Sequence, residues 1–143
     1  MNREQIEQCI PHREPFLWLD EVTELTERSI SARKHLRPDL DVFRGHYPDF
    51  PLLPGVLQCE AMFQAAAILI SRLLPVGEDA APVVTRLSNG QFRRMVRPGE
   101  TLTIDVELVE RVSKAFYLKG RTSVDGRVTA RIEFACTEAP RAG

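Results

Sequence analysis

The sequence predicts an α+β fold in which one curved antiparallel sheet surrounds one long helix. Residues 55–74, "GVLQCEAMFQAAAILISRLL", are apolar nearly all round, which is typical of a helix buried on most sides. The C-terminal half instead alternates apolar and polar residues, the pattern of half-buried strands. A sheet wrapped around the helix buries both patterns most economically. Because 143 residues suffice for one core, we expect one domain over 1–143.

The N-terminal third predicts a short helix, two strands and a loop. Residues 2–10 are amphipathic and precede a proline, so they predict a short helix. "FLWLDEVTEL" (16–25) and "SISARKHL" (29–36) are typical of two strands joined by a polar turn. Four prolines punctuate 38–54, so we expect a structured loop without a regular element there.

The remaining two thirds predict the long helix and most of the sheet. Residues 55–74 are rich in good helix formers and are followed by Pro75 and Gly77, which end a helix. Further strands are expected at 82–92, 101–109, 114–124 and 127–136. Asp125-Gly126 suits a tight hairpin turn, so the last three strands form an antiparallel meander. Such a sheet of five or six strands has open edges, which favour edge-to-edge dimerisation.

Composition and charge exclude several classes of partner. The formal net charge is -1 and no basic block is present, so we expect no nucleic acid partner. The longest apolar run, 65–70, is far shorter than the ~20 residues that span a bilayer, so we expect no membrane partner. The polar N-terminus is unlike a secretory signal, and three widely spaced cysteines without a CxxC indicate reduced thiols. We therefore expect a cytoplasmic protein.

Glu60 is a carboxylate inside the apolar helix, with Val56, Met62 and Phe63 as candidates for burial around it. An ionised carboxylate is costly to bury unless it is paired or neutralised. Gln64 lies one turn further on the same face, where it could hydrogen-bond the carboxylate. Glu60 is therefore either a functional acid or a structural residue on a stripe that reaches solvent or another subunit.

His46 is the histidine of the proline-rich loop. Imidazole suits proton transfer near neutral pH, although a loop histidine is often only hydrogen-bonded to the backbone. His12 and His35 have weaker claims, and the three histidines lack metal-ligand spacing.

Pro54 and Gly55 begin the long helix, where unsatisfied N–H groups and the helix dipole favour negative charge. Gly55 has no Cβ, so a substrate oxygen could approach the backbone closely. The alternative is an ordinary helix start after a proline. A base, an acid and this helix N-terminus together suit proton abstraction beside a carbonyl. That chemistry needs no metal or redox cofactor, and it requires the loop and the helix to meet, within one chain or across a subunit boundary.

Three ordered blocks resemble one family. "PHREPFLWLDEV", "GHYPDFPLLPGVLQCEAMFQAA" and "FRRMVRPGETL" are similar to motifs of the β-hydroxyacyl-acyl-carrier-protein dehydratases of fatty-acid synthesis, which have the hot-dog fold. The resemblance implies a lyase that dehydrates a (3R)-3-hydroxyacyl thioester, on acyl carrier protein or coenzyme A, to the trans-2-enoyl thioester without a cofactor. It also implies a homodimer, often assembled into a hexamer (a trimer of dimers), with the His and Glu of each site on different subunits.

The resemblance assigns roles to individual residues. His46 and Glu60 match the catalytic pair, Gly55 the amide that polarises the thioester carbonyl, and Gln64 the residue that orients the glutamate. It also implies substrate contacts at Val56, Tyr47 and Phe63, and places three basic residues beside the entering phosphopantetheine arm: Arg93, Arg94 and Arg97.

Four residues depart from the family pattern and bear on substrate identity: Trp18, Tyr47, Asp49 and Phe63. Two other functions remain open. One is a hot-dog thioesterase in which Glu60 activates water, and the other is a non-catalytic subunit that binds acyl thioesters or supports a partner. The pathway served could be fatty-acid synthesis or a specialised lipid or polyketide route.

Overall fold

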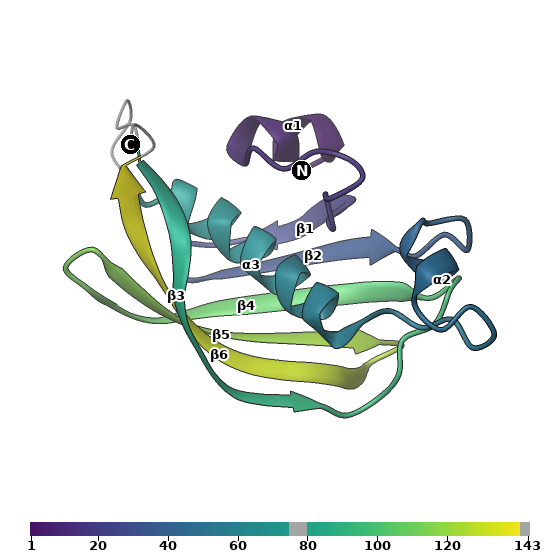
Figure 1. Cartoon of the computed structure of the whole chain (residues 1–143). Helices are drawn as coiled ribbons and strands as arrows, with labels where there is room; N and C mark the ends of the chain where they lie inside the picture. Colours follow the sequence, from purple (N-terminus) through teal and green to yellow (C-terminus); the bar gives the residue numbers. More distant parts are fainter. Residues whose placement is uncertain (75–79, 141–143) are drawn as a thin grey trace.

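The computed structural model describes residues 1–74 and 80–140 and shows a six-stranded antiparallel sheet curved around one helix (Figure 1). The strand order is β1-β2-β4-β5-β6-β3. The elements in chain order are α1 (Arg3–Cys9), β1 (Glu21–Leu25), β2 (Ser29–His35), α2 (Val42–Gly45), α3 (Gly55–Ser71), β3 (Ala80–Phe92), β4 (Thr101–Val112), β5 (Ala115–Val124) and β6 (Arg127–Pro140). The predicted α+β architecture is confirmed.

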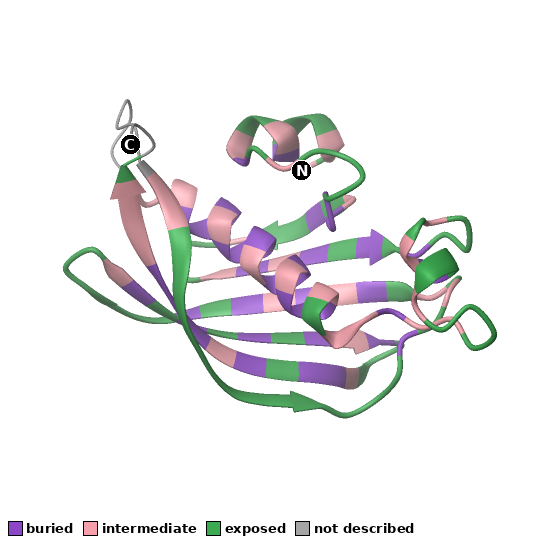
Figure 2. Ribbon diagram, in the orientation of Figure 1, coloured by how far each residue is buried: buried purple, intermediate pink, exposed green. Residues whose placement is uncertain are grey.

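Helix α3 forms the centre of the core, and most of its residues are buried (Figure 2). It approaches the sheet closely at Gly120 on β5, where an added Cβ would lie 2.7 Å from the Met62 Sδ atom. The helix begins at Gly55 as predicted and ends at Ser71, three residues before the predicted end. The proposed stop at Pro75 and Gly77 lies outside the described residues.

The alternating pattern of the C-terminal half is confirmed. Leu102, Ile104 and Val106 on β4 are buried, and β4, β5 and β6 pair as an antiparallel meander. Asp125 and Gly126 have positive φ angles of 51° and 77°. Two such residues form the turn that matches the twist of a two-residue hairpin, so the turn prediction is also confirmed.

Two N-terminal predictions are wrong. The first strand begins at Glu21, so 16–20 lies outside it. The backbone N–H of Trp18 donates to the Gln64 side chain at 2.8 Å instead of to a neighbouring strand. The loop over 38–54 also contains a one-turn helix, α2, which buries the side chain of Phe43.

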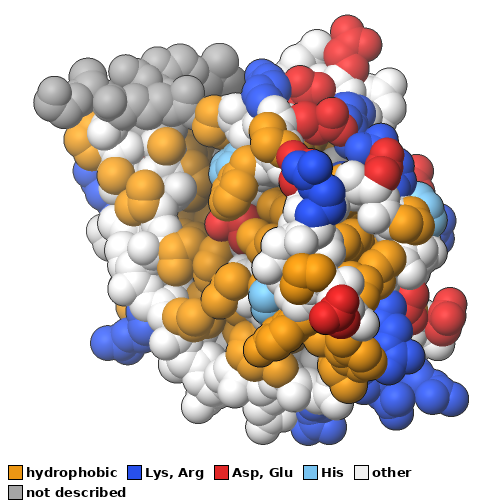
Figure 3. Space-filling view, turned by 45° about the vertical axis from the view of Figure 1, so that its right-hand side comes forward, with side chains coloured by type: hydrophobic (Ala, Val, Ile, Leu, Met, Phe, Trp, Pro, Cys, Tyr) orange, Lys and Arg blue, Asp and Glu red, His pale blue; other side chains and the backbone are white. Residues whose placement is uncertain are grey.

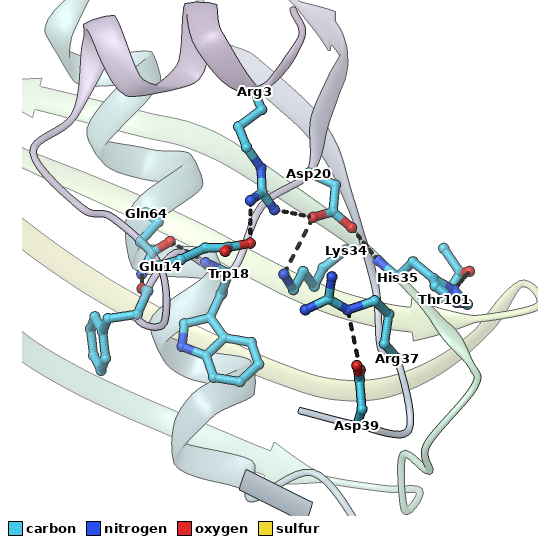
Figure 4. Close-up of polar contacts among 11 residues, drawn as sticks. Arg3, Glu14, Trp18, Asp20, Lys34, His35, Arg37, Asp39, Gln64 and Thr101 are labelled. Carbon is cyan, nitrogen blue, oxygen red and sulfur yellow. Dashed lines mark hydrogen bonds and ion pairs between the residues drawn. The ribbon is translucent and has the colours of Figure 1, made fainter. Parts of the chain in front are cut away.

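Asp20 connects the N-terminal helix to the sheet (Figure 4). Its carboxylate accepts hydrogen bonds from the side chains of Arg3 at 3.0 Å and Lys34 at 3.3 Å, and from the His35 backbone N–H at 2.7 Å. Lys34 is buried, and its ammonium lies 5.8 Å from the centre of the Trp18 ring. A buried ammonium needs such a partner because desolvation disfavours its charge. This cluster fixes the segment between α1 and β1 against β2.

Strand β3 forms one edge of the sheet and exposes apolar side chains at Val83, Val84, Leu87 and Phe92. Exposed apolar groups along an unpaired edge are typical of a surface that another chain covers. Within residues 1–74 and 80–140, no helix has both the length and the apolar character needed to cross a bilayer.

Candidate active site

Glu60 lies in the second turn of α3, and the Gln64 Nε2 group donates to its Oε2 atom at 3.0 Å. The hydrogen bond expected from the spacing of the two residues is therefore present. The Glu60 side chain keeps 23% of its surface exposed, so it is half-buried instead of enclosed. It can therefore reach a bound molecule.

Gln64 is completely buried and is held at both ends of its amide. Its Oε1 atom accepts from the Trp18 backbone N–H, and its Nε2 group donates to the Phe16 carbonyl, each at 2.8 Å. Figure 4 shows Gln64 and Trp18 in this contact. Because two backbone groups fix the amide, the donor that reaches Glu60 has one defined position. The orienting role that the resemblance implies for Gln64 would require such a fixed donor.

His12 also lies beside Glu60, and sequence reasoning missed this. Its Nε2 atom is 3.7 Å from the Glu60 Oε2 atom. Its Nδ1 atom is buried and has no hydrogen-bond partner in the described part of the chain. The available signal was its place in "PHREPF", whose last residue is Phe16, one of the two backbone partners of Gln64.

A small cavity of about 150 Å³ adjoins this acid. Its lining combines the polar side chains of His12 and Glu60 with five other residues: Phe63, Ala67, Pro82, Val84 and Cys136. The Phe63 ring packs edge-on against Phe134 with centres 5.1 Å apart. Burial raises the pKa of the Cys136 thiol to about 12. Because the thiolate is the nucleophilic form, Cys136 is a wall of the cavity and not a nucleophile.

His46 follows α2, and its Nδ1 atom lies 2.9 Å from the Leu52 carbonyl oxygen. A carbonyl only accepts, so Nδ1 carries a hydrogen, and in the neutral ring the lone pair is then on Nε2. The ring also contacts Tyr47 edge-on at 4.7 Å. Among the described residues, no hydrogen bond or ion pair joins His46 to Glu60. Within the described residues of one chain, the histidine that lies beside Glu60 is therefore His12 and not His46.

Gly55 lines a larger hollow of about 1010 Å³ at the start of α3. An added Cβ there would lie 2.7 Å from the Phe92 ring. The Phe92 ring therefore occupies the position that a Cβ would take, and the lack of a side chain at Gly55 allows this ring contact. Val56 was a candidate for burial but is 73% exposed at the rim. The three predicted basic residues line the same hollow: Arg93, Arg94 and Arg97.

A buried polar cluster behind this hollow was also missed. The Gln58 Oε1 atom accepts from the hydroxyls of Thr122 at 2.8 Å and Thr129 at 2.9 Å. Thr122 occupies an inward position in the alternation of β5, and this polar residue among apolar ones was the available signal. The cluster satisfies the polar atoms that α3 brings against the sheet.

Hydrophobic side chains cover much of the face shown in Figure 3, with acidic and histidine side chains between them. Large exposed apolar residues include Tyr47 and Phe50 in the loop and Phe92 and Met95 beside the hollow. Apolar surface of this extent is typical of a site that binds another chain or an apolar ligand.

Comparisons with known proteins identify the family of the chain. Residues 10–133 match the family described as FabA-like domain. The chain is 39% identical to 3-hydroxyacyl-[acyl-carrier-protein] dehydratase FabZ of Petrotoga mobilis over 133 residues, which is 93% of this chain and 94% of that protein. It is 40% identical to the FabZ of Erythrobacter litoralis over 134 residues, 92% of this chain and 88% of that protein.

Solved structures share the fold at lower identity. The dehydratase heterocomplex ApeI:P from Xenorhabdus doucetiae superposes with a TM-score of 0.79 at 19% identity, over 95% of this chain and 91% of that one. A hypothetical thioesterase with coenzyme A from Streptococcus pneumoniae gives a TM-score of 0.67 at 12% identity, over 86% and 88%. The chain belongs to the FabA-like family of 3-hydroxyacyl-acyl-carrier-protein dehydratases and has its hot-dog fold.

Proposed function

We propose that the protein is a lyase that dehydrates a (3R)-3-hydroxyacyl thioester, carried by acyl carrier protein, to the trans-2-enoyl thioester in fatty-acid or related lipid biosynthesis. The observation that carries this proposal is the carboxyl of Glu60, held by the buried Gln64 beside a small cavity that it lines. The relatives that share more than a third of its sequence are named as dehydratases of this kind.

The proposed reaction begins at His46, whose Nε2 lone pair accepts the C2 proton of the substrate. The Leu52 carbonyl keeps the hydrogen on Nδ1, so the free lone pair stays on Nε2. The electron pair of the broken C–H bond forms the C2–C3 double bond as the C3–O bond breaks. Glu60 in its protonated form donates to the departing hydroxyl, which leaves as water. Solvent then returns His46 and Glu60 to their starting protonation states.

Negative charge develops on the thioester oxygen during proton removal. In the proposed complex, the Gly55 N–H at the start of α3 donates to that oxygen, and the helix dipole adds to the stabilisation. The Phe92 ring occupies the position of the missing Cβ and not the direction of the N–H, so this contact is compatible with the proposed role of the amide.

We further propose a homodimer in which each site combines His46 of one chain with Glu60 of the other, and assembly of dimers into hexamers. His46 and Glu60 share no contact within the described residues of one chain. The exposed apolar edge of β3 also suits antiparallel pairing with a second copy of itself.

The carrier is inferred from charge. Four arginines line the hollow at the start of α3: Arg93, Arg94, Arg97 and Arg127. Guanidinium groups suit recognition of the phosphate on a phosphopantetheine arm.

We place the reaction in the cytoplasm, because three cysteines are free thiols, as expected in a reducing compartment: Cys9, Cys59 and Cys136.

The test is turnover of short and medium 3-hydroxyacyl thioesters on both acyl carrier protein and coenzyme A, followed by the absorbance of the enoyl thioester. We expect reversible formation of the enoyl product, with faster turnover on the carrier protein. A saturated acyl thioester is the control, since a dehydratase leaves it intact. Release of free thiol from it would instead favour a thioesterase in which Glu60 activates water. Binding without any turnover would favour a non-catalytic subunit.

A further inference from the structure

His12 is a second titratable group beside the proposed acid, and the mechanism above does not use it. Its Nε2 atom lies 3.7 Å from the Glu60 Oε2 atom, and both residues line the same small cavity. At 3.7 Å the contact is longer than a hydrogen bond. Catalytic hydrogen bonds are often long in unliganded enzymes, however, and shorten when the substrate binds.

The other ring nitrogen of His12 indicates its tautomer. Nδ1 is buried and has no partner among residues 1–74 and 80–140. A buried N–H without an acceptor is costly, and an imidazolium would place a charged N–H there. A neutral ring with its hydrogen on Nε2 avoids both costs and leaves only a lone pair at Nδ1. That hydrogen then points toward Glu60.

Gln64 approaches the same carboxyl oxygen. Its Nε2 group donates to Glu60 Oε2 at 3.0 Å, and its amide is fixed by two backbone groups. Gln64 donates to Oε2, and the His12 Nε2 atom lies 3.7 Å from the same atom, so Oε2 is the accepting oxygen of the carboxyl group. When Glu60 is protonated, its proton therefore resides on Oε1. Oε1 has no hydrogen-bond partner in the described part of the chain and is free to meet the substrate.

We propose that His12 is a positioning residue for Glu60: as a neutral Nε2–H donor it acts with Gln64 to hold Oε2 and so assigns the acid proton to Oε1. This rests on the proposed dehydratase function of Glu60. His12 neither takes nor gives a proton in the reaction, so its role requires a hydrogen-bond donor and not a titrating group.

The first test measures the tautomer directly. The ¹⁵N chemical shifts of the imidazole nitrogens of the full-length protein are recorded near neutral pH, and the His12 signals are assigned from their loss in the His12→Gln variant. We expect a protonated Nε2 and a bare Nδ1. A hydrogen on Nδ1, or a doubly protonated ring, would overturn the proposal. This readout does not depend on activity, so it stands apart from any failure of the proposed function.

The second test compares two substitutions with different donors. Glutamine places an N–H₂ group close to the Nε2 position and cannot titrate in this range, whereas leucine offers no donor. We expect His12→Leu to lower kcat about 10²-fold with little change in KM, because the acid is then misplaced. His12→Gln should retain most of the activity and the wild-type pH profile.

His35→Gln is the matched control, because that histidine is exposed and, among the described residues, its ring hydrogen-bonds only to Thr101. Equal loss of kcat in His12→Gln and His12→Leu, with a changed pH profile, would show that His12 transfers protons and would overturn the positioning role. Wild-type kcat in His12→Leu would also overturn it. An inactive wild-type protein would instead contradict the proposed function, while the ¹⁵N measurement would still test the tautomer.

Discussion

Glu60 and His46 are the two proposed reacting groups, and the chain supports them in different ways. Glu60 stands on a 17-residue helix in the core, and its amide partner Gln64 is fixed by backbone groups from a segment far away in the sequence. His46 lies in a loop and is held by one carbonyl six residues further on. The acid is therefore positioned by the tertiary structure, and the base by a local turn.

This difference predicts which properties change when the surroundings of Glu60 or of His46 are altered. Changes around Glu60 disturb buried hydrogen bonds and therefore affect both stability and activity. Changes around His46 disturb a half-exposed loop, so they should affect activity with little loss of stability. The following predictions test that contrast.

The largest effects should come from the two groups themselves. His46→Ala and Glu60→Gln should each lower kcat for hydration of a crotonyl thioester by about 10²–10⁴-fold, the usual contribution of a general acid or base. Steady-state kinetics measures the effect, and thermal unfolding by circular dichroism confirms that each variant folds. Wild-type turnover in either variant would remove that residue from the mechanism.

Mixing the two inactive variants tests whether the halves come from different chains. Unfolding His46→Ala and Glu60→Gln together and refolding them should restore about a quarter of the wild-type activity, since half of the random dimers are mixed and each has one intact site. The two variants refolded separately are the control. A mixture that stays as inactive as its components would place both groups of a site on one chain.

Gln64→Leu tests how far the position of Glu60 depends on the buried hydrogen bonds of Gln64. The substitution leaves the Trp18 N–H and the Phe16 carbonyl unpaired, so the free energy of unfolding should fall by roughly 1–3 kcal/mol for each group that stays buried. Urea denaturation measures this. Gln58→Leu is the matched control, because it also removes a buried glutamine from α3 yet leaves Glu60 held. We expect similar destabilisation there and a smaller loss of kcat, and the reverse order would contradict the role of Gln64.

The smallest effect is expected at Tyr47, beside His46. Its φ angle of 56° is unfavourable for a residue with a Cβ by about 1–2 kcal/mol and is free of strain for glycine. Tyr47→Gly should therefore unfold at a urea concentration equal to or slightly above that of the wild type, with a modest loss of kcat because the ring contact with His46 is gone. Tyr47→Ala, which keeps the strained backbone, serves as the control. A strongly destabilised Tyr47→Gly variant would show that the loop depends on this side chain.

The sequence was sufficient for elements whose signals are local. The apolar run of α3 and the alternation of β4–β6 report burial residue by residue, so these elements were predicted closely. Residues 16–20 were predicted wrongly because the Trp18 N–H bonds Gln64, 46 positions away. No local pattern reports such a contact.

The same limit applies to the candidate site. The pairing of Glu60 with Gln64 follows from helical spacing and could be predicted. The approach of His12 to Glu60 and of Phe92 to Gly55 depends on how distant segments pack, so neither could be read from the sequence. In our proposal, the acid that His46 meets is Glu60 of a second chain.

The exposed edge of β3 affects the newly synthesised chain before it assembles with a second copy. Before it finds its partner, an open strand with apolar side chains is a template for aggregation. The same strand carries Pro82, Arg86 and two irregularities in its pairing with β6, features that discourage indiscriminate pairing. The refolding yield should therefore pass through a maximum as the chain concentration rises. At low concentration partners rarely meet, and at high concentration aggregation exceeds what these features of β3 prevent.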